Sequence, residues 1–441
     1  MKKLYSIGMV IVGALLLNAC SGGGSPAPAP LNVVAVAGDS SVTVTWDMVP
    51  GVTYWLYTAA GSSVTPENCV FLPQCTTTLN ASSPAVVAGT IGVGGLTNGT
   101  TYSFTINGRT GGGPGGPGSL SVSAVPRLAG ATWVAGTATA ANNLRGVTPY
   151  VPPGKPTASG FLAVDEAGII YSTPDGATWA PAYTANTTRL NAVIHSGGIY
   201  LAVGAGGKIL RSTDAITWTT STSGTTEDLY AITSNGATRF VATGGHGTIL
   251  YSDDGITWTL AANATPNTLY AVAYGNYGSG TFVAVGATGT LLTSVNGGVA
   301  WQVGTSNTTS DLHGVTFSTP SSAGGLNYGS NAANTANPTS TIGAMGTFVA
   351  VGAGGTLVTS SDNAATWAAR PAIASPNLNA VTYWHQFVAV GDAGGIFTSI
   401  DGINWTAQTS VASTPLYAVT SNPAIYGYLT VGTAGENLLS R

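Results

Sequence analysis

The sequence is poor in charged residues. Asp, Glu, Lys and Arg make up 6% of its 441 residues, whereas an ordinary globular domain has about 25%. Hydrophobic residues make up 44%, which excludes the highly charged and weakly apolar composition of an intrinsically disordered chain. The formal net charge of −4 argues against a nucleic-acid-binding protein, because such a protein presents a basic surface to the phosphates.

Residue types that hold metals and cofactors are also scarce. The chain has three cysteines and four histidines, and no histidine stands at metal-ligand spacing from another. No phosphate-binding loop, dinucleotide fingerprint or Ser-His-Asp order stands on a suitable structural element. We therefore expect no cofactor and no metal-dependent chemistry.

The N-terminus carries a short apolar run. Lys2 and Lys3 precede an apolar stretch from Ile7 to Leu17, which is too short to span a bilayer comfortably and is typical of a secretory signal. The ending Leu17-Asn-Ala-Cys20 resembles the bacterial lipobox. This resemblance implies that residues 1–20 are a lipoprotein signal peptide and that a lipidated Cys20 becomes the mature N-terminus. The alternative is a plain secretory signal with an incidental cysteine.

The lipobox resemblance also implies a location. Ser21 stands where, in lipoproteins, an Asp favours retention in the inner membrane. We therefore expect a lipid-anchored protein of the bacterial cell envelope, in the outer membrane, facing either the periplasm or the surface. Residues 21–30 are rich in Gly, Ser and Pro and predict a flexible tether. In an exported chain, Cys69 and Cys75 predict a disulfide that closes a small loop.

Residues 31–127 have the pattern of short strands separated by turns. The segments 41–46 and 101–106 alternate with period two. The strand ending at Trp46, the segment 96–104 and the strand 121–126 resemble a fibronectin type III domain. The resemblance implies a β-sandwich with Trp46 in the core and a corner hydrogen bond from Tyr102. We expect a spacer, and the alternative is an independent binding surface.

The rest of the chain, residues 129–441, is an internal repeat. Each unit has an inner-strand signature Leu-x-Ala/Gly-Val/Ile, an apolar second strand, a third strand and a tight turn before a Trp. From Trp179 to Trp405, the tryptophans that follow this turn are 38 to 43 residues apart, except for one step of 66. Four short strands in about 40 residues form a β-propeller blade. The inner strands begin at Leu144, Leu190, Leu229, Leu269, Leu312, Leu378 and Leu416.

The two ends of the repeat region predict how the ring closes. The seventh unit stops at Arg441, where its fourth strand and its Trp should begin. The segment Gly130-Ala-Thr-Trp133 at the front matches Gly176-Ala-Thr-Trp179. The N-terminal strand should therefore complete the last blade and remove an open sheet edge. The predicted fold is all-β: a fibronectin type III-like sandwich (31–127) followed by a seven-bladed propeller (129–441).

The turn before each Trp resembles the Asp-box, or BNR, repeat Ser-x-Asp-x-Gly-x-Thr-Trp. A carboxylate at this position can hold a tight turn by accepting backbone N–H groups, while the Trp is buried between blades. We therefore assign a structural rather than a catalytic role to the residues at this position, which are Asp175, Asp214, Asp254, Asn296, Asp362 and Asp401.

The Asp-box resemblance also bears on function. The blade sequence is most similar to propellers related to photosystem II assembly factors, which implies a non-catalytic grip on a protein client. Sialidases share the Asp-box, but their Arg-Ile-Pro segment is absent here. A xyloglucanase-type glycosidase, whose family uses two propellers, would need two opposed carboxylates. The candidates outside the boxes are Asp165, Glu166, Glu227, Asp228, Asp311 and Asp392, and solvated surface charges are the simpler interpretation.

The second position of each inner strand varies between repeats and should ring the mouth of the channel. Aromatic and hydrogen-bonding side chains that converge on a concave opening are the components of a ligand pocket. The alternative is that these side chains pack between blades or fill the channel. The ring comprises Arg145, Asn191, Tyr230, Tyr270, His313, Asn379 and Tyr417.

The insertions lie on the opposite face. Residues 148–160 and 318–346 extend inner hairpins, and Tyr383, Trp384 and His385 form the corresponding turn of the sixth blade. An exposed Trp is a plausible anchor for a partner, and the alternative is one half-buried Trp beside low-complexity loops. We predict a non-catalytic binding or scaffold protein with a protein partner in the envelope. The alternatives are a propeller that binds or cleaves glycans and a surface adhesin.

Overall fold

The structure is a computed structural model. It describes residues 25–440 except 39, 62, 70–75, 81–87, 112–113, 128, 138–141, 153–159, 263, 319–345, 374–375 and 423–426. The chain forms two compact units, one built mainly from residues before Pro126 and the other mainly from Pro126–Arg441. Cys20 and Cys75 lie outside the described residues, so the lipidation and the disulfide stay predictions. In the part of the chain that is described, no helix is long and apolar enough to cross a membrane.

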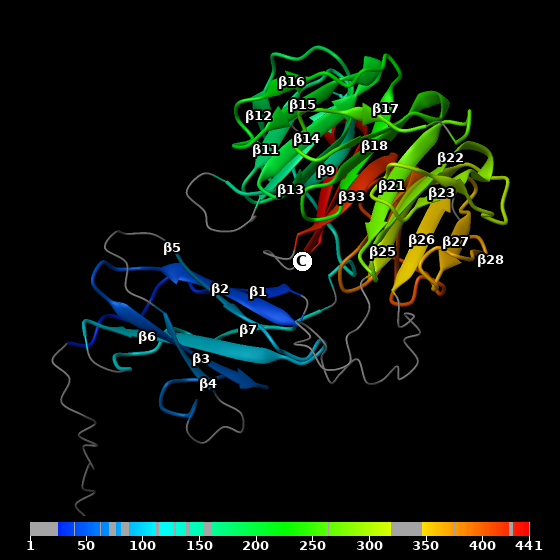
Figure 1. The fold of residues 1–441 in the computed structure, drawn as a ribbon. Helices are drawn as coiled ribbons and strands as arrows, with labels where there is room; N and C mark the ends of the chain where they lie inside the picture. The colour runs from blue at the N-terminus through cyan, green and yellow to red at the C-terminus, as the bar shows by residue number, and fades with distance from the viewer. Residues whose placement is uncertain are drawn as a thin grey trace, which may run out of the picture. The chain divides into compact units, whose positions relative to one another are not determined.

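The first unit contains a three-stranded and a four-stranded antiparallel sheet, in the orders β1-β2-β5 and β4-β3-β6-β7 (Figure 1). Trp46 is 1% exposed. Its ring packs edge to face against the ring of Tyr54, which belongs to the other sheet, with centroids 5.6 Å apart. Membership of the fibronectin type III family stays a prediction. The strands are β1 (Val34–Gly38), β2 (Ser41–Asp47), β3 (Thr53–Ala60), β4 (Thr76–Asn80), β5 (Ala88–Val93), β6 (Tyr102–Arg109) and β7 (Val122–Ala124).

Part of the predicted tether is attached to this unit. The Ala27 amide donates to the Gly108 carbonyl at 2.9 Å, and the Thr110 amide donates to the Ser25 carbonyl at 3.0 Å. Ala27 is buried. Ser25–Ala27 are therefore held by the first unit, because this segment pairs with the end of β6 and its backbone groups gain partners there. A flexible tether over residues 21–30 stays a prediction.

The second unit is a seven-bladed β-propeller, as predicted: its described residues form seven four-stranded antiparallel sheets (Figure 1). Blades 1 to 3 consist of β9 (Leu144–Tyr150), β10 (Gly160–Asp165), β11 (Ile170–Thr173) and β12 (Ala180–Tyr183); β13 (Leu190–Ser196), β14 (Ile199–Gly204), β15 (Ile209–Ser212) and β16 (Thr219–Ser221); and β17 (Leu229–Ser234), β18 (Phe240–Gly244), β19 (Ile249–Ser252) and β20 (Thr259–Leu260).

Blades 4 to 6 follow the same order from the inner to the outer strand. They consist of β21 (Leu269–Gly275), β22 (Thr281–Gly286), β23 (Leu291–Ser294) and β24 (Gln302–Val303); β25 (Leu312–Ser318), β26 (Thr347–Gly352), β27 (Leu357–Ser360) and β28 (Ala368–Arg370); and β29 (Leu378–Tyr383), β30 (Phe387–Gly391), β31 (Ile396–Ser399) and β32 (Thr406–Ala407).

The seventh blade closes the ring with strands from both ends of the propeller. It consists of β33 (Leu416–Asn422), β34 (Gly427–Gly432), β35 (Asn437–Ser440) and β8 (Val134–Ala135). Val134 pairs with Leu439 and Ala135 pairs with Leu438. The Gly130 amide also donates to the Ser440 hydroxyl at 2.7 Å. The predicted closure by the N-terminal strand is confirmed.

Short 3₁₀ turns join the second and third strands of five blades. They are η2 (Ala205–Gly207), η3 (Gly245–Gly247), η4 (Ala287–Gly289), η6 (Asp392–Gly394) and η8 (Thr433–Gly435). Their middle residues have a positive φ, for example 61° at Gly206 and 53° at Thr288. This left-handed conformation turns the chain sharply at the same end of the blade where the inner strand begins.

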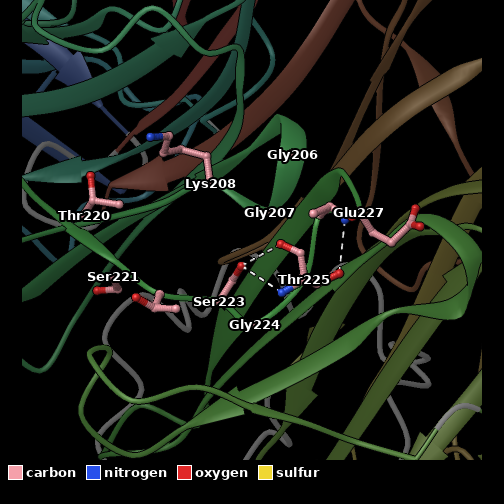
Figure 2. Close-up of a pocket in the computed structure, with 11 residues that line it drawn as sticks. Gly206, Gly207, Lys208, Thr220, Ser221, Ser223, Gly224, Thr225 and Glu227 are labelled. Atoms are coloured by element: carbon pink, nitrogen blue, oxygen red, sulfur yellow. Dashed lines mark hydrogen bonds between the residues drawn. The ribbon is translucent and has the colours of Figure 1, made fainter.

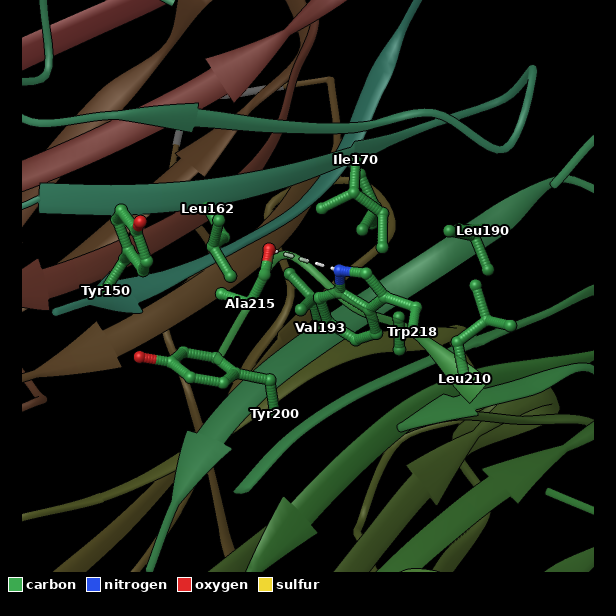
Figure 3. Packing of buried hydrophobic residues seen from close by; sticks show 11 residues of the cluster. Tyr150, Leu162, Ile170, Leu190, Val193, Tyr200, Leu210, Ala215 and Trp218 are labelled. Atoms are coloured by element: carbon green, nitrogen blue, oxygen red, sulfur yellow. Dashed lines mark hydrogen bonds between the residues drawn. The ribbon is translucent and has the colours of Figure 1, made fainter. Parts of the chain in front are cut away.

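The core of the propeller lies between blades. Sheets covered on both faces have nearly continuous apolar strands, and every residue of β10, β22 and β26 is buried. Figure 3 shows the cluster between blades 1 and 2, where Leu162 and Ile170 of blade 1 pack with Leu190, Val193 and Trp218 of blade 2. Among the described residues, seven such clusters each join two neighbouring blades.

Candidate functional site

Each blade has two chemically different ends. We call the end with the inner-strand starts and the η turns the mouth end, and the end with the Asp-box turns and the inner hairpins the Asp-box end. Because neighbouring strands run antiparallel, the start of the first strand and the turn between the second and third strands lie at the same end. The predicted ring residues therefore all belong to the mouth end.

The ring residues share one backbone feature, a β-bulge. In blade 2, Leu190 pairs with Gly204 and Ala192 pairs with Val203, so the register skips Asn191. The same shift recurs at the second position of every inner strand. A bulge re-aims the extra side chain out of the regular alternation of a strand. The glycine opposite it is required by close approach, since a Cβ on Gly204 would lie 2.0 Å from the Arg189 carbonyl oxygen.

Three ring residues bind the backbone of the next blade. The Asn191 amide donates to the Leu229 carbonyl at 2.8 Å, and the Asn379 amide donates to the Leu416 carbonyl at 3.0 Å. His313 donates from Nδ1 to the Leu378 carbonyl at 3.1 Å. These bonds satisfy carbonyls at the bulges and tie neighbouring blades together. Packing between blades therefore explains one hydrogen-bonding group in each of these three side chains.

Three neighbouring blades carry an aromatic arc, which we define as Tyr230, Tyr270 and His313. Tyr230 and Tyr270 meet edge to face with ring centroids 5.9 Å apart, and Tyr270 meets His313 in the same way at 5.7 Å. All three side chains are half-buried. Within the described residues, the hydroxyls of Tyr230 and Tyr270 have no hydrogen-bond partner. The arc is therefore a partly exposed aromatic surface with two hydroxyl groups that no described residue binds.

The mouth end of blades 7, 1, 2 and 3 carries a charged network instead. Arg145 forms an ion pair with Glu166 and lies over the ring of Tyr417, 4.2 Å from its centroid. Arg189 forms an ion pair with Asp228 at 2.7 Å. Burial raises the pKa of Glu166, but hydrogen bonds from Arg145 and Asn143 and the nearby arginine charges outweigh it, so its pKa lies below the ordinary value.

The carboxylates that are candidates for glycoside cleavage accept hydrogen bonds from neighbouring groups. Asp165 is fully buried and accepts the Ile169 amide at 2.7 Å and the Tyr171 hydroxyl at 3.2 Å. Asp392 accepts the side-chain amides of Asn377 and Asn379 at 2.7 and 3.0 Å. Burial, together with the Asp165 charge, raises the pKa of Tyr171 to about 12. These bonds hold the turns and the bulges in place.

Sequence reasoning named Asp228 and Asp311 only as candidate carboxylates and missed the structural role of the residue that precedes the inner-strand Leu. In four blades it is Asp or Asn, and its side chain accepts the amide of the left-handed turn residue of the preceding blade. Examples are Asp228 with Gly206 at 2.8 Å and Asp311 with Thr288 at 2.7 Å. The recurrence of Asp or Asn at this position was the available signal. Asp228 and Asp311 therefore connect blades.

An open hollow of about 600 Å³ lies beside the mouth end, where the chain passes from blade 2 to blade 3. Figure 2 shows its lining, which includes Lys208 and Glu227. Its wall is held by local hydrogen bonds: the Ser223 hydroxyl donates to the Thr225 carbonyl at 3.2 Å, and the Glu227 amide donates to the Thr225 hydroxyl at 3.1 Å. Glu227 also pairs with His246 at 2.8 Å.

The Asp-box end is uniform by comparison. Asp214 accepts the amides of Ile216 and Thr217 at 2.8 and 2.7 Å, and these bonds lower its pKa to about 2. Asp175, Asp254 and Asp401 also accept two backbone amides each, whereas Asn296 and Asp362, in the longer turns, accept one. The geometry is that of a turn held by its own side chain.

The other predicted partner-facing residues are engaged in packing. Trp384 is half-buried, stacks on His385 with centroids 3.8 Å apart and meets the buried Tyr428 at 6.1 Å. Tyr383 packs on Phe387 with centroids 4.7 Å apart. These contacts favour the half-buried alternative for Trp384. No group of three metal-ligating side chains occurs in the residues that the structure covers.

The fold and the ring define a class of protein: an all-β chain with a seven-bladed propeller whose variable side chains gather at one end. Solved structures share this fold. YCF48 bound to a D1 peptide is 18% identical with a TM-score of 0.52 and covers 70% of this chain and 96% of its own. YCF48 from Cyanidioschyzon merolae is 17% identical with a TM-score of 0.51, and covers 70% and 98%.

A third similar structure is the WD40 β-propeller domain of Doa1. It is 10% identical with a TM-score of 0.50 and covers 70% of this chain and 95% of its own. No family model matches the chain, and no curated protein matches its sequence. At these identities the likeness establishes the propeller fold.

Proposed function

We propose that the propeller is a non-catalytic binding module that holds a segment of a protein partner at its mouth end. One observation carries this proposal: a β-bulge recurs at the variable second position of all seven inner strands, at the same end of an otherwise uniform scaffold. Binding residues are commonly presented by loops and irregular positions on a rigid frame. The ring offers aromatic, amide and charged groups within one surface.

The carboxylates support binding over glycoside cleavage. Cleavage requires an acid and a second carboxylate opposed across a cleft. Here Asp165 is fully buried, Glu166 is paired with Arg145 and Asp228 with Arg189. These carboxylates would have to give up the bonds that they already make in order to act on a sugar.

The solved structures are consistent with a peptide ligand. YCF48 has this fold, and one of its structures is described as bound to a D1 peptide. By analogy, a segment of a protein is the ligand that we propose for this propeller. The envelope location is a part of the proposal that depends on Cys20, and Cys20→Ser should release the protein from the membrane fraction if the anchor is a lipid.

Site-directed photocrosslinking tests the proposal directly. A photoreactive amino acid at position 270 should yield a discrete adduct with an envelope protein in cells. The matched control places it at Ile256, which is 54% exposed at the Asp-box end of blade 3. An adduct from position 270 and none from position 256 is the expected result. Equal adducts from both positions, or none from 270 together with glycan turnover by the purified protein, would contradict it.

A further inference from the structure

We propose that Asn296 is a site of spontaneous deamidation, promoted by the turn around it, which converts this residue to aspartate or isoaspartate without an enzyme. Asn296 lies in the Asp-box turn of blade 4, is exposed, and is followed by Gly297. A glycine has no side chain to hinder attack by its own backbone nitrogen on the preceding residue. The site belongs to the Asp-box end and is therefore independent of the partner that binds at the mouth end.

The reaction takes place within the chain. The backbone nitrogen of Gly297 attacks Cγ of Asn296 and forms a C–N bond. The bond from Cγ to Nδ2 breaks, and Nδ2 leaves as ammonia with the proton of the Gly297 nitrogen. Water then opens the succinimide ring. Cleavage at Cγ gives aspartate, and cleavage at the main-chain carbonyl carbon gives isoaspartate, whose main chain runs through Cγ.

The sequence has four Asn-Gly pairs, which begin at positions 98, 107, 235 and 296, and the structure separates them. The Gly99 and Gly236 amides each donate a hydrogen bond to a neighbouring oxygen, at 2.8 and 3.0 Å. Asn107 is 2% exposed and lies inside strand β6. Among the described residues, no acceptor binds the Gly297 amide. The attacking nitrogen is therefore least restrained in the pair that begins at Asn296.

The length of the turn explains this difference from the other boxes. In blade 3, as in blade 6, the glycine directly after the Asp binds the Ser at the start of the box, and the Gly255 amide donates to the Ser252 hydroxyl at 2.9 Å. The turn of blade 4 is one residue longer. There the amide of Gly298, and not that of Gly297, donates to the Ser294 hydroxyl at 3.0 Å.

The same turn polarises the side-chain amide that is attacked. The Ser294 hydroxyl donates to Oδ1 of Asn296 at 2.9 Å, and the Ala300 amide donates to the same oxygen at 3.0 Å. Attack on Cγ places negative charge on Oδ1, and donors aimed at an oxygen that gains charge lower the reaction barrier. Asn235 also has two backbone donors on Oδ1, but the Gly236 nitrogen beside it is bound.

Arg239 favours the charged product. Its Nη1 donates to the Gly297 carbonyl at 3.0 Å, and a Cβ on Gly297 would lie 3.7 Å from its Cζ. A carboxylate at position 296 would therefore form near this guanidinium, which also pairs with the exposed Asp253 at 2.8 Å. Aspartate keeps the acceptor of the turn and matches the other five boxes. Isoaspartate lengthens the main chain and shortens the side chain, so it should lose turn bonds.

The test follows all four Asn-Gly sites in the purified full chain by peptide mapping and mass spectrometry during incubation at mildly alkaline pH. In the folded protein we expect conversion at position 296 to be at least tenfold faster than at 98, 107 and 235. In denaturant the fold no longer separates the sites, so the four rates should agree within about threefold. Labelling by an isoaspartyl methyltransferase measures the share of isoaspartate.

Substitutions at Ser294 separate promotion by the turn from simple exposure. Ser294→Ala removes one donor to Oδ1 and should slow conversion at position 296 about fivefold in the folded protein, the effect of one hydrogen bond, and not in denaturant. Ser294→Thr should keep the wild-type rate, because Thr173 occupies this position in blade 1 and donates to Asp175 at 2.9 Å. Ser252→Ala, at the same position in blade 3, is the matched control and should change the rate less than twofold.

Two outcomes would overturn the inference. One is conversion at position 296 that is no faster in the folded protein than conversion at the other three sites. The other is conversion that Ser294→Ala leaves unchanged or accelerates while Ser294→Thr and wild type agree. Thermal unfolding temperatures should show that the variants are folded. Asn296→Asp, which reproduces one product, should unfold at the wild-type temperature or above it, whereas aged protein rich in isoaspartate should unfold at a lower temperature.

Discussion

The Asp-box end and the mouth end of each blade use similar residues to make different kinds of bond. At the Asp-box end, Asp214 binds amides only two and three residues further along the chain. At the mouth end, Asp228 binds Arg189 and Gly206 of the preceding blade, 39 and 22 positions away. The first end is assembled by local bonds that repeat, and the second by bonds between blades that differ around the ring. The uniform local bonds of the Asp-box end specify the fold, and the variable mouth end is the part that we propose recognises a partner.

The largest effect should come from the Asp-box end. Trp218 is 7% exposed and packs between blades 1 and 2, where its indole N–H donates to the Ala215 carbonyl at 3.2 Å. We expect Trp218→Ala to lower the free energy of unfolding by about 3–5 kcal/mol, as for other buried Trp truncations. Urea titration measures this loss. Trp405→Ala is the control, because Trp405 is only half-buried, and an equal loss there would contradict the comparison.

A smaller effect should follow from the turn carboxylate itself. Removing the acceptor with Asp214→Ala should cost about 1 kcal/mol, the usual cost of losing a side-chain cap. Asp214→Asn should retain much of this stability, since Asn296 occupies the same position in blade 4 and accepts the Ala300 amide at 3.0 Å. An Asp214→Asn protein as unstable as Asp214→Ala at neutral pH would show that the charge, and not the acceptor, holds the turn.

The Asp214 turn should also depend on pH in a defined direction. Its folded-state pKa of about 2 lies below the ordinary value of 3.8. Its stabilising contribution is therefore fully present above pH 4 and is lost as the pH falls toward 2. The difference in unfolding free energy between wild type and Asp214→Asn should shrink over this interval. A difference that is constant from pH 5 to pH 2 would contradict the assignment.

The charged network at the mouth end should matter less for stability. Arg145 and Glu166 have side chains that are each 33% exposed, so their ion pair is screened by solvent. We expect Arg145→Gln to lower the free energy of unfolding by less than about 1 kcal/mol. Most of this loss should disappear at high salt concentration. Urea titrations at low and high NaCl concentration measure both values, and a loss that salt does not reduce would point to packing on Tyr417 instead.

The smallest stability effect should come from the aromatic arc. Tyr230 is half-buried and contacts Tyr270 at its edge. Tyr230→Ala should therefore cost about 1 kcal/mol or less, in the range of one aromatic pair, while partner crosslinking from position 270 falls at least tenfold. A loss as large as that of Trp218→Ala would make the arc part of the core and would remove the distinction between the two ends.

The sequence predicted the propeller because its signals are local and repeated. Seven Leu-x-Ala/Gly-Val/Ile starts give the number of blades, and the match of Gly130–Trp133 to a complete blade gives the closing strand. Neither prediction needed the contacts between blades. The Gly/Ser/Pro composition of residues 21–30 was less informative, because it does not reveal that Ser25 and Ala27 hydrogen-bond to the end of β6.

The site was predictable only as a set of positions. The pattern Leu-x-Ala looks like a regular strand, so the bulge at the middle residue could not be foreseen. Three tyrosines therefore seemed equivalent in the sequence. The structure separates them: Tyr230 and Tyr270 belong to the aromatic arc, whereas Tyr417 lies under the guanidinium of Arg145. That distinction arises from contacts between blades, which are far apart in the chain.

The pairing of Val134 with Leu439 sets the order in which the propeller can be assembled. A ribosome delivers the N-terminal strand before any complete blade and residues 437–440 only after the first six blades. Until then blade 7 lacks its third strand, and the buried faces of its neighbours have no cover on that side. Contacts between residues this distant form late and slowly. Deleting β35 (Asn437–Ser440) should therefore leave an open ring that exposes apolar surface, which is the form of the chain most prone to aggregate.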